Sequence, residues 1–90
     1  MPRYIIERNM PGVGDLSKEE FDAGSRRSAE VANQVGVVWI RSYISEAEGK
    51  VYCEYEAPNP EAILEHARIA GFPADKISEV AMEIHPGMFV

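Results

Sequence analysis

The sequence contains few cysteine, tryptophan and histidine residues, and it has no long apolar run. It has one cysteine, Cys53, one tryptophan and two histidines among 90 residues. A single cysteine excludes an internal disulfide, so we expect a domain that folds in the reducing cytoplasm. No stretch approaches the roughly 18 apolar residues of a membrane-spanning helix, and the first residues do not resemble a secretory signal. We therefore expect no membrane association.

Basic residues are also scarce, with 9 Lys and Arg against 15 Asp and Glu and a formal net charge of -6. Arg26 and Arg27 form the only basic pair, and this balance disfavours nucleic acid as a partner. The sequence has no glycine-rich phosphate loop, Walker motif or CxxC pair, so we expect no organic cofactor. A chain this short buries only roughly 60 to 65% of its unfolded surface, and pairing with a second copy would add stability.

Two helices are predicted from capping signals. Ser17 and Glu20 match a capping box, which predicts a helix over residues 18–34 that stops at Gly36. Asn59 is suited to the N-cap of a second helix, over residues 60–70.

Four strands are predicted from β-branched and aromatic residues between turn signals. They are expected over residues 3–8, 37–44, 51–56 and 77–84. In the last strand, alternation places Ser78, Val80, Met82 and Ile84 on the more apolar face. Residues 83–90 are expected to form an extended or flexible tail.

The predicted order βαββαβ indicates one α+β domain over residues 1–90, a ferredoxin-like sandwich. Right-handed crossovers place both helices on one face of a four-stranded antiparallel sheet. The other face has no helix, although the strand over residues 37–44 is apolar on both sides in its first half. We therefore expect a homodimer through the helix-free face, of the dimeric αβ-barrel type.

Several blocks of the sequence resemble a family of small bacterial ferredoxin-like proteins that is named after its nickel-binding, nickel-responsive member. The blocks are Trp39-Ile40-Arg41-Ser42-Tyr43, the Cys53 strand running into Glu56-Ala57-Pro58-Asn59-Pro60-Glu61-Ala62, Glu65-His66-Ala67-Arg68, and Gly71-Phe72-Pro73-Ala74-Asp75. The resemblance implies a homodimer with a barrel-like αβ subunit and, in at least one relative, bound nickel. It assigns no metal ligand to a residue of this chain.

His66 is the leading candidate for a functional residue. Ile63, His66, Ala67 and Ala70 follow helical spacing, so the imidazole is expected on the core-facing side of the second helix. Its place near the C-terminal turn would favour the protonated ring, which opposes metal binding. In a structural alternative, His66 is hydrogen-bonded to a Ser or Tyr hydroxyl.

Cys53 is the second candidate, because Val51, Cys53 and Tyr55 share the strand face that we expect to lie toward the helices. The first helix has small residues on its inner stripe, which leaves room for a pocket lined by Cys53, His66, hydroxyl groups and an aromatic residue, either Trp39 or Tyr43. Imidazole and thiolate suit nickel, zinc or copper. The structural alternative is that Cys53 serves as a small core hydrophobe.

Two other groups of residues are weaker candidates for a functional site. Glu83 and His85 are two residues apart near the predicted last strand and would converge on one ion there, although an exposed strand edge is the simpler interpretation. Tyr43, with other tyrosines, would bind a small substrate or pack in the dimer interface.

The sequence thus supports two hypotheses about function. In the first, a homodimer without catalytic activity binds a small ligand or a divalent transition ion such as nickel, with His66 and Cys53 as the central residues and Glu83 and His85 as minor ones. In the second, a cofactor-independent αβ-barrel enzyme acts on a small organic substrate, with His66 as general base assisted by Cys53 and Tyr43. We favour the first.

Overall fold

The fold contains a sheet of four strands. In the strands over residues 3–9 and 50–56, buried side chains alternate with less buried ones. A computed structural model describes residues 1–90. The strands are β1 (Arg3–Asn9), β2 (Val38–Ser45), β3 (Lys50–Glu56) and β4 (Lys76–Glu79). They lie in the order β2-β3-β1-β4, and neighbouring strands are antiparallel. This arrangement confirms the ferredoxin-like fold predicted from the sequence.

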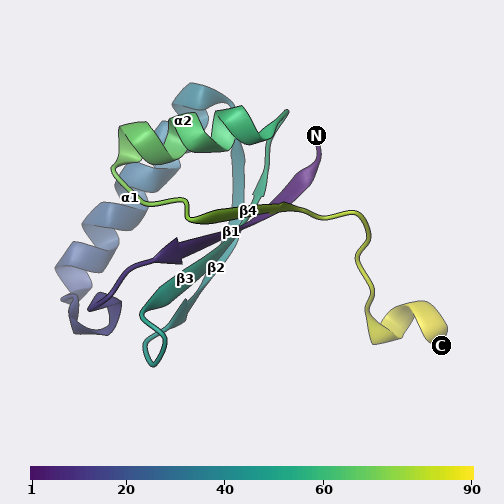
Figure 1. Cartoon of the computed structure of the whole chain (residues 1–90), viewed down its shortest axis with the longest axis horizontal. Helices are drawn as coiled ribbons and strands as arrows, with labels where there is room; N and C mark the ends of the chain where they lie inside the picture. Colours follow the sequence, from purple (N-terminus) through teal and green to yellow (C-terminus); the bar gives the residue numbers. More distant parts are fainter.

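Both helices lie on the same face of this sheet (Figure 1). Helix α1 (Lys18–Val35) begins with the predicted capping box at Ser17 and ends at Gly36, which adopts the left-handed conformation at φ 77°. Helix α2 (Pro60–Ala70) begins at Asn59, whose side chain accepts a hydrogen bond from the backbone of Ala62. Neither helix is long and apolar enough to cross a lipid bilayer.

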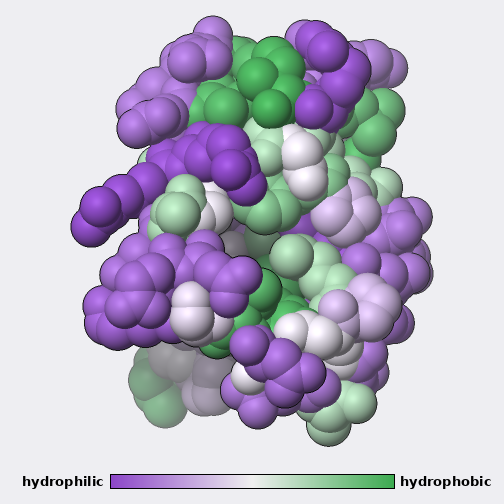
Figure 2. Space-filling view, turned by 90° about the vertical axis from the view of Figure 1, so that its left-hand side faces the viewer, coloured by the Kyte–Doolittle hydropathy of each residue, from purple (hydrophilic) through white to green (hydrophobic).

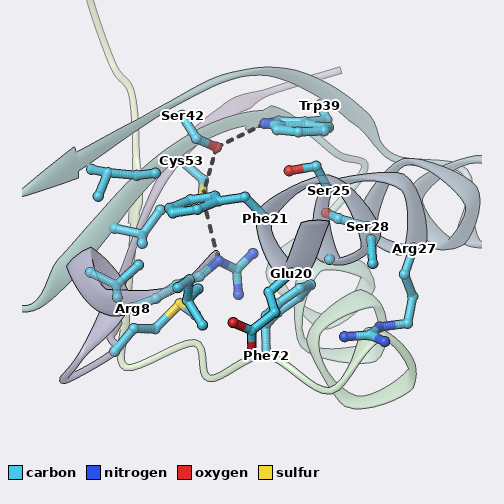
Figure 3. Close-up of a pocket in the computed structure, with 17 residues that line it drawn as sticks. Arg8, Glu20, Phe21, Ser25, Arg27, Ser28, Trp39, Ser42, Cys53 and Phe72 are labelled. Carbon is cyan, nitrogen blue, oxygen red and sulfur yellow. Dashed lines mark hydrogen bonds between the residues drawn. The ribbon is translucent and has the colours of Figure 1, made fainter. Parts of the chain in front are cut away.

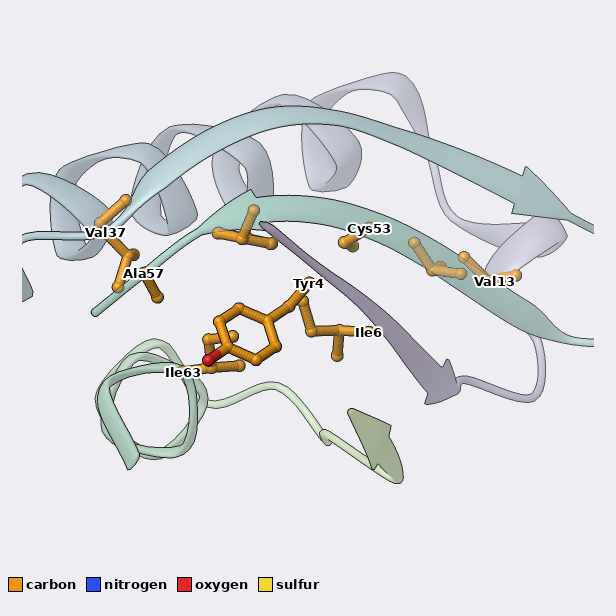
Figure 4. Close-up of a cluster of buried hydrophobic side chains, with 10 residues drawn as sticks. Tyr4, Ile6, Val13, Val37, Cys53, Ala57 and Ile63 are labelled. Carbon is orange, nitrogen blue, oxygen red and sulfur yellow. The ribbon is translucent and has the colours of Figure 1, made fainter. Parts of the chain in front are cut away.

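The hydrophobic core fills the space between the sheet and α2 and continues under α1 (Figure 4). Its buried members come from the two inner strands β1 and β3, from both helices and from the segments that adjoin these elements: Tyr4, Ile6, Val13, Ala32, Val37, Val51, Cys53, Tyr55, Ala57 and Ile63. Cys53 therefore lies on the helix-facing side of β3, as its alternation with Val51 and Tyr55 predicted. Two short 3-10 turns lie outside the sheet, η1 (Val13–Asp15) and η2 (Pro86–Phe89).

The helix-free face of the sheet is polar. Ion pairs between neighbouring strands cover much of it, such as those of Arg41 with Glu54 and of Lys76 with Glu7. Val38 and Tyr43 of β2 are exposed apolar or aromatic residues beside these charges.

The last strand is shorter than the sequence predicted. The sequence predicted a strand up to residue 84, but the observed strand ends at Glu79, and residues 80–85 have no regular secondary structure. β4 pairs only with β1, and its final hydrogen bond runs from the backbone of Val80 to Arg3 at 2.8 Å. β1 begins at Arg3, and the carbonyl of Pro2 accepts a hydrogen bond from the backbone of Ala57 on the opposite side of β1, so β4 has no further partner there. The strand stops because its partner stops.

The predicted faces of the last strand were also wrong. Ile77 packs against the core, whereas Ser78 is exposed. Met82 and Ile84, expected on the more apolar face, are exposed in the segment after the strand. This segment leads away from the body of the protein to the C-terminus (Figure 1).

Candidate functional site

A cavity of about 620 Å³ lies between the N-terminal half of α1 and the sheet. Figure 2 looks onto the side of the molecule that carries the beginning of α1, and it shows a hollow with hydrophobic residues inside and hydrophilic residues around it. Ten of the seventeen lining residues are hydrophobic. The lining comprises Arg8, Met10, Val13, Leu16, Glu20, Phe21, Ala23, Gly24, Ser25, Arg27, Ser28, Trp39, Ser42, Ile44, Val51, Cys53 and Phe72.

Small residues on α1 create this space. Ala23, Gly24, Ser25 and Ser28 line the cavity, and side chains of this size do not reach the sheet. Phe21, a bulky residue of the same helix, also lines the cavity, and its ring lies among the other lining side chains (Figure 3). The room that the sequence predicted under this helix is therefore present.

A chain of hydrogen bonds crosses the sheet side of the cavity (Figure 3). Trp39 Nε1 donates to Ser42 Oγ at 2.9 Å, and Ser42 Oγ donates to Cys53 Sγ at 3.0 Å. On its other side, Cys53 Sγ accepts a hydrogen bond from Arg8 Nε at 3.4 Å. The register of β2 shifts between Trp39 and Arg41, and this irregularity puts Trp39 and Ser42 on the same side of the strand although they are three residues apart.

Arg8 is a buried cation that sequence reasoning missed. It is 3% exposed, and its Nη1 donates to the carbonyl of Pro73. Its guanidinium also lies over the rings of Tyr55 and Phe72, at 5.9 and 5.8 Å from their centroids. The signal was present in the sequence, because Arg8 follows Tyr4 and Ile6 at spacing two and so shares their buried face.

His66 is fully buried, as its place on the apolar stripe of α2 predicted. It does not line the cavity. Its Nε2 lies 3.0 Å from the carbonyl oxygen of Ser28, to which it donates, and 3.4 Å from Ser28 Oγ. Ser28 lines the cavity, so His66 lies behind Ser28 and has the hydrogen-bonded position of the structural alternative. Nδ1 of His66 is buried and has no partner.

The surroundings of His66 favour its neutral form. Burial lowers the pKa of His66, because the charged ring loses its hydration; the hydrogen bond to Ser28 opposes this shift, and the positive charge of Arg8 adds to it. This direction is opposite to the effect of the helix dipole, which alone would favour protonation. The neighbouring Tyr55 ring, 5.2 Å away between centroids, has a hydroxyl 3.2 Å from Ser28 Oγ. Burial raises the pKa of Tyr55, against the lowering effects of Ser28 and Arg8.

The remaining predicted residues lie away from the cavity. Tyr43 is exposed on the helix-free face, where it pairs with Tyr52 of β3. Glu83 and His85 lie beyond the end of β4, so no strand aligns them, and Glu83 contacts Arg3 at 3.7 Å. The structure therefore brings Cys53 to the cavity, places His66 one layer behind it, and keeps Tyr43, Glu83 and His85 elsewhere.

The donor groups of one chain do not fit a complete metal site. No three His, Cys, Asp or Glu side chains converge where they could hold a metal ion. Cys53, the one thiol, lies beside the positive charge of Arg8, which repels a cation. His66 Nε2 is already engaged with Ser28. A metal would therefore need other donors or a rearrangement of these contacts.

The fold is that of a ferredoxin-like domain with a cavity between α1 and the sheet, and comparison with known proteins identifies its family. Residues 4–80 match the family described as "Nickel responsive protein SCO4226-like". The chain belongs to this family, which confirms the resemblance found in the sequence. No curated protein sequence matches the chain.

Two solved structures share the fold. The crystal structure of SCO4226 from Streptomyces coelicolor A3(2) has a TM-score of 0.77 and 24% sequence identity, covering 91% of this chain and 99% of that chain. The NMR structure of TM0320 from Thermotoga maritima, described as a heavy metal binding protein, has a TM-score of 0.50 and 20% identity, covering 87% of this chain and 98% of that chain. At these identities the likeness concerns the fold alone.

Proposed function

We propose that this protein is a cytoplasmic homodimer that binds a small ligand in the cavity under α1 and does not catalyse a reaction. The cavity itself carries the proposal, because its volume of about 620 Å³ lies within the range of ligand sites in proteins. Its mainly apolar wall, with a few inward polar groups such as Cys53, Ser42 and Arg8, is the usual chemistry of such sites.

The position of Trp39 allows a direct test of cavity binding. Trp39 is the only tryptophan and lines the cavity, so its fluorescence reports on occupancy. Titration with octanamide, a neutral apolar probe, is expected to change this fluorescence in a saturable way. Ser25→Phe places a large ring at the cavity wall and should weaken binding. Arg26→Phe changes the next residue of α1, which does not line the cavity, and should bind as the wild type does. Equal binding by both variants would contradict the proposal.

Nickel or another divalent transition ion is the second candidate ligand. Its support is membership of a family described as nickel responsive, together with the fold shared with a protein described as heavy metal binding. Since the donors of one chain do not converge, we propose that a site would use donors from both copies of a dimer. Glu83 and His85 are exposed and are the candidate donors that two copies could share, whereas Cys53 and His66 are buried on the helix side of the sheet and would bind a metal only after a rearrangement. Imidazole ligands must be neutral, so nickel affinity should fall as the pH drops through the histidine range.

Native mass spectrometry with and without nickel tests this second candidate, since it reports oligomeric state and metal stoichiometry together. The expected result is a dimer that retains nickel, with less nickel on His66→Ala and His85→Ala. Isothermal titration that gives equal heat for the wild type and His66→Ala would remove His66 from the site. A protein that retains no nickel at neutral pH would contradict metal binding and leave the cavity proposal untouched.

A further inference from the structure

Arg8 is a buried positive charge without a negative partner. The chain has seven ion pairs, and none of them involves Arg8. Its hydrogen bonds go to a sulfur and a carbonyl, and Nη2 has no partner at all. Burying an unpaired charge costs free energy, so a bound anion next to this guanidinium would stabilise the protein.

The position of Arg8 offers a place for such an anion. Arg8 lines the cavity, and Figure 3 shows its guanidinium directed toward the middle of the lining side chains, next to Cys53. The cavity wall carries two arginines, Arg8 and Arg27, and one carboxylate, Glu20. Glu20 is occupied in the capping box, where its side chain accepts a hydrogen bond from the backbone of Ser17 at 2.9 Å. The wall is thus net positive in a chain whose formal net charge is -6.

The number of Arg8 nitrogens without a hydrogen-bond partner indicates which kind of anion would fit beside it. Nε and Nη1 are engaged with Cys53 and Pro73, so Nη2 is the nitrogen left to donate; it is buried, and a ligand group meets it once the Arg8 side chain shifts toward the cavity. Arg27 is exposed: its Nε donates to the carbonyl of Ala70 at 2.9 Å, and its guanidinium lies over the ring of Phe72. Arg8 is therefore the one buried cation of the wall, and a single buried cation with one free nitrogen suits a monoanion such as a carboxylate.

The rest of the wall is apolar and aromatic. Phe21, Trp39 and Phe72 lie around the space next to Arg8 (Figure 3). Apolar surface of this kind favours a ligand with a hydrophobic body.

We propose that the cavity binds a small organic monocarboxylate with an apolar body, and that Arg8 holds its carboxylate through Nη2. This inference rests on the proposed function, since it names the class of ligand for the same cavity. The apolar part of the ligand lies against Phe21, Trp39 and Phe72, while the carboxylate supplies the negative charge that Arg8 lacks.

The test compares octanoate with octanamide, which have the same apolar chain and differ in charge. Affinities are measured by Trp39 fluorescence and isothermal titration at neutral pH. Because hydrogen bonds to charged groups are the stronger ones, the wild type is expected to prefer octanoate by roughly 10- to 100-fold. Arg8→Met keeps the length and apolar character of the side chain and should abolish this preference. Arg26→Met removes an exposed charge outside the cavity and should retain it.

The outcomes separate this inference from the proposed function. If the wild type binds octanoate and octanamide equally, or if Arg8→Met keeps the preference, the cavity remains a ligand site and the carboxylate inference is overturned. If neither probe binds, both proposals are overturned. Replacing a buried unpaired charge by an apolar residue of similar size is often neutral or stabilising, so the melting temperature of Arg8→Met should equal or exceed that of the wild type. If this variant does not fold, the relative affinity of the wild type for octanoate and octanamide still tests the carboxylate inference.

Discussion

Two buried polar residues, Arg8 and His66, each have one nitrogen without a hydrogen-bond partner. Leaving such an atom unsatisfied costs on the order of 1 to 3 kcal/mol. The two cases differ in position, because Arg8 lines the cavity and His66 does not. A ligand entering the cavity therefore has access to the surroundings of Arg8, whereas His66 acts on the site through Ser28, which it contacts from behind.

His66 should make the stability of the protein depend on pH. Its pKa is lowered in the folded state, so between its ordinary value near 6.5 and that lower value only the unfolded chain takes up the proton. The free energy of unfolding is therefore expected to fall as the pH drops below about 6.5 and to level off below the folded pKa. Each pKa unit between the two states corresponds to about 1.4 kcal/mol.

Urea unfolding at several pH values between neutrality and mild acid measures this effect. His66→Gln keeps a donor for Ser28 but does not titrate, so this part of the pH dependence should disappear, whatever the overall stability of the variant. His85→Gln removes the exposed histidine and should follow the wild-type profile. Identical profiles for the wild type and His66→Gln would show that His66 titrates alike in both states.

Helix α1 shows how an element shapes the site. Its capping signals set where it begins and ends, and its small residues set how much space remains above the sheet. Gly24 lies within the helix and lines the cavity, and an added Cβ there would meet the Phe72 ring at 3.6 Å, an ordinary contact. Gly36 ends the same helix in the left-handed conformation, with φ at 77°.

These two glycines should respond to alanine in opposite directions. Gly24→Ala should raise the free energy of unfolding by up to about 1 kcal/mol, because alanine is the better helix former. Gly36→Ala should lower it by about 1 kcal/mol or more, because a side chain strains the left-handed conformation. Thermal and urea unfolding of both variants checks this. A loss of stability in Gly24→Ala would mean that the cavity wall tolerates no added methyl group.

At the scale of the whole molecule, the folded chain has a polar sheet face that no helix covers. A symmetric dimer brings such a face against its own copy, and alternating Arg and Glu side chains can then pair across the interface. Tyr43 and Val38 lie exposed on this face and would be buried by the partner copy. These features support the proposed homodimer.

Native mass spectrometry at micromolar concentration is expected to find a dimer. Tyr43→Glu adds a charge to both halves of the interface and should weaken the dimer at least about tenfold. Leu64→Glu, an equally drastic change at an exposed position on α2, should leave dimerisation unchanged. A monomeric wild type, or a dimer weakened only by Leu64→Glu, would contradict the proposed interface.

Local sequence signals were enough to predict most of the elements. The capping residues Ser17 and Asn59 and the terminal Gly36 are all used as predicted, because a cap interacts with backbone only a few residues away. The alternation around Cys53 and the helical spacing around His66 correctly placed both side chains inside the fold, since these periods follow from the backbone geometry of one element.

Features that depend on contacts between distant segments did not follow from those signals. The end of β4 depends on where β1 begins, and the irregularity after Trp39 depends on pairing with β3. The same holds for the site: Arg8 is held by Cys53 and Pro73, which are 45 and 65 residues away along the chain, and His66 is held by Ser28, 38 residues away. The sequence places a side chain inside or outside its own element, but packing between elements determines which groups it meets there and whether it faces open space.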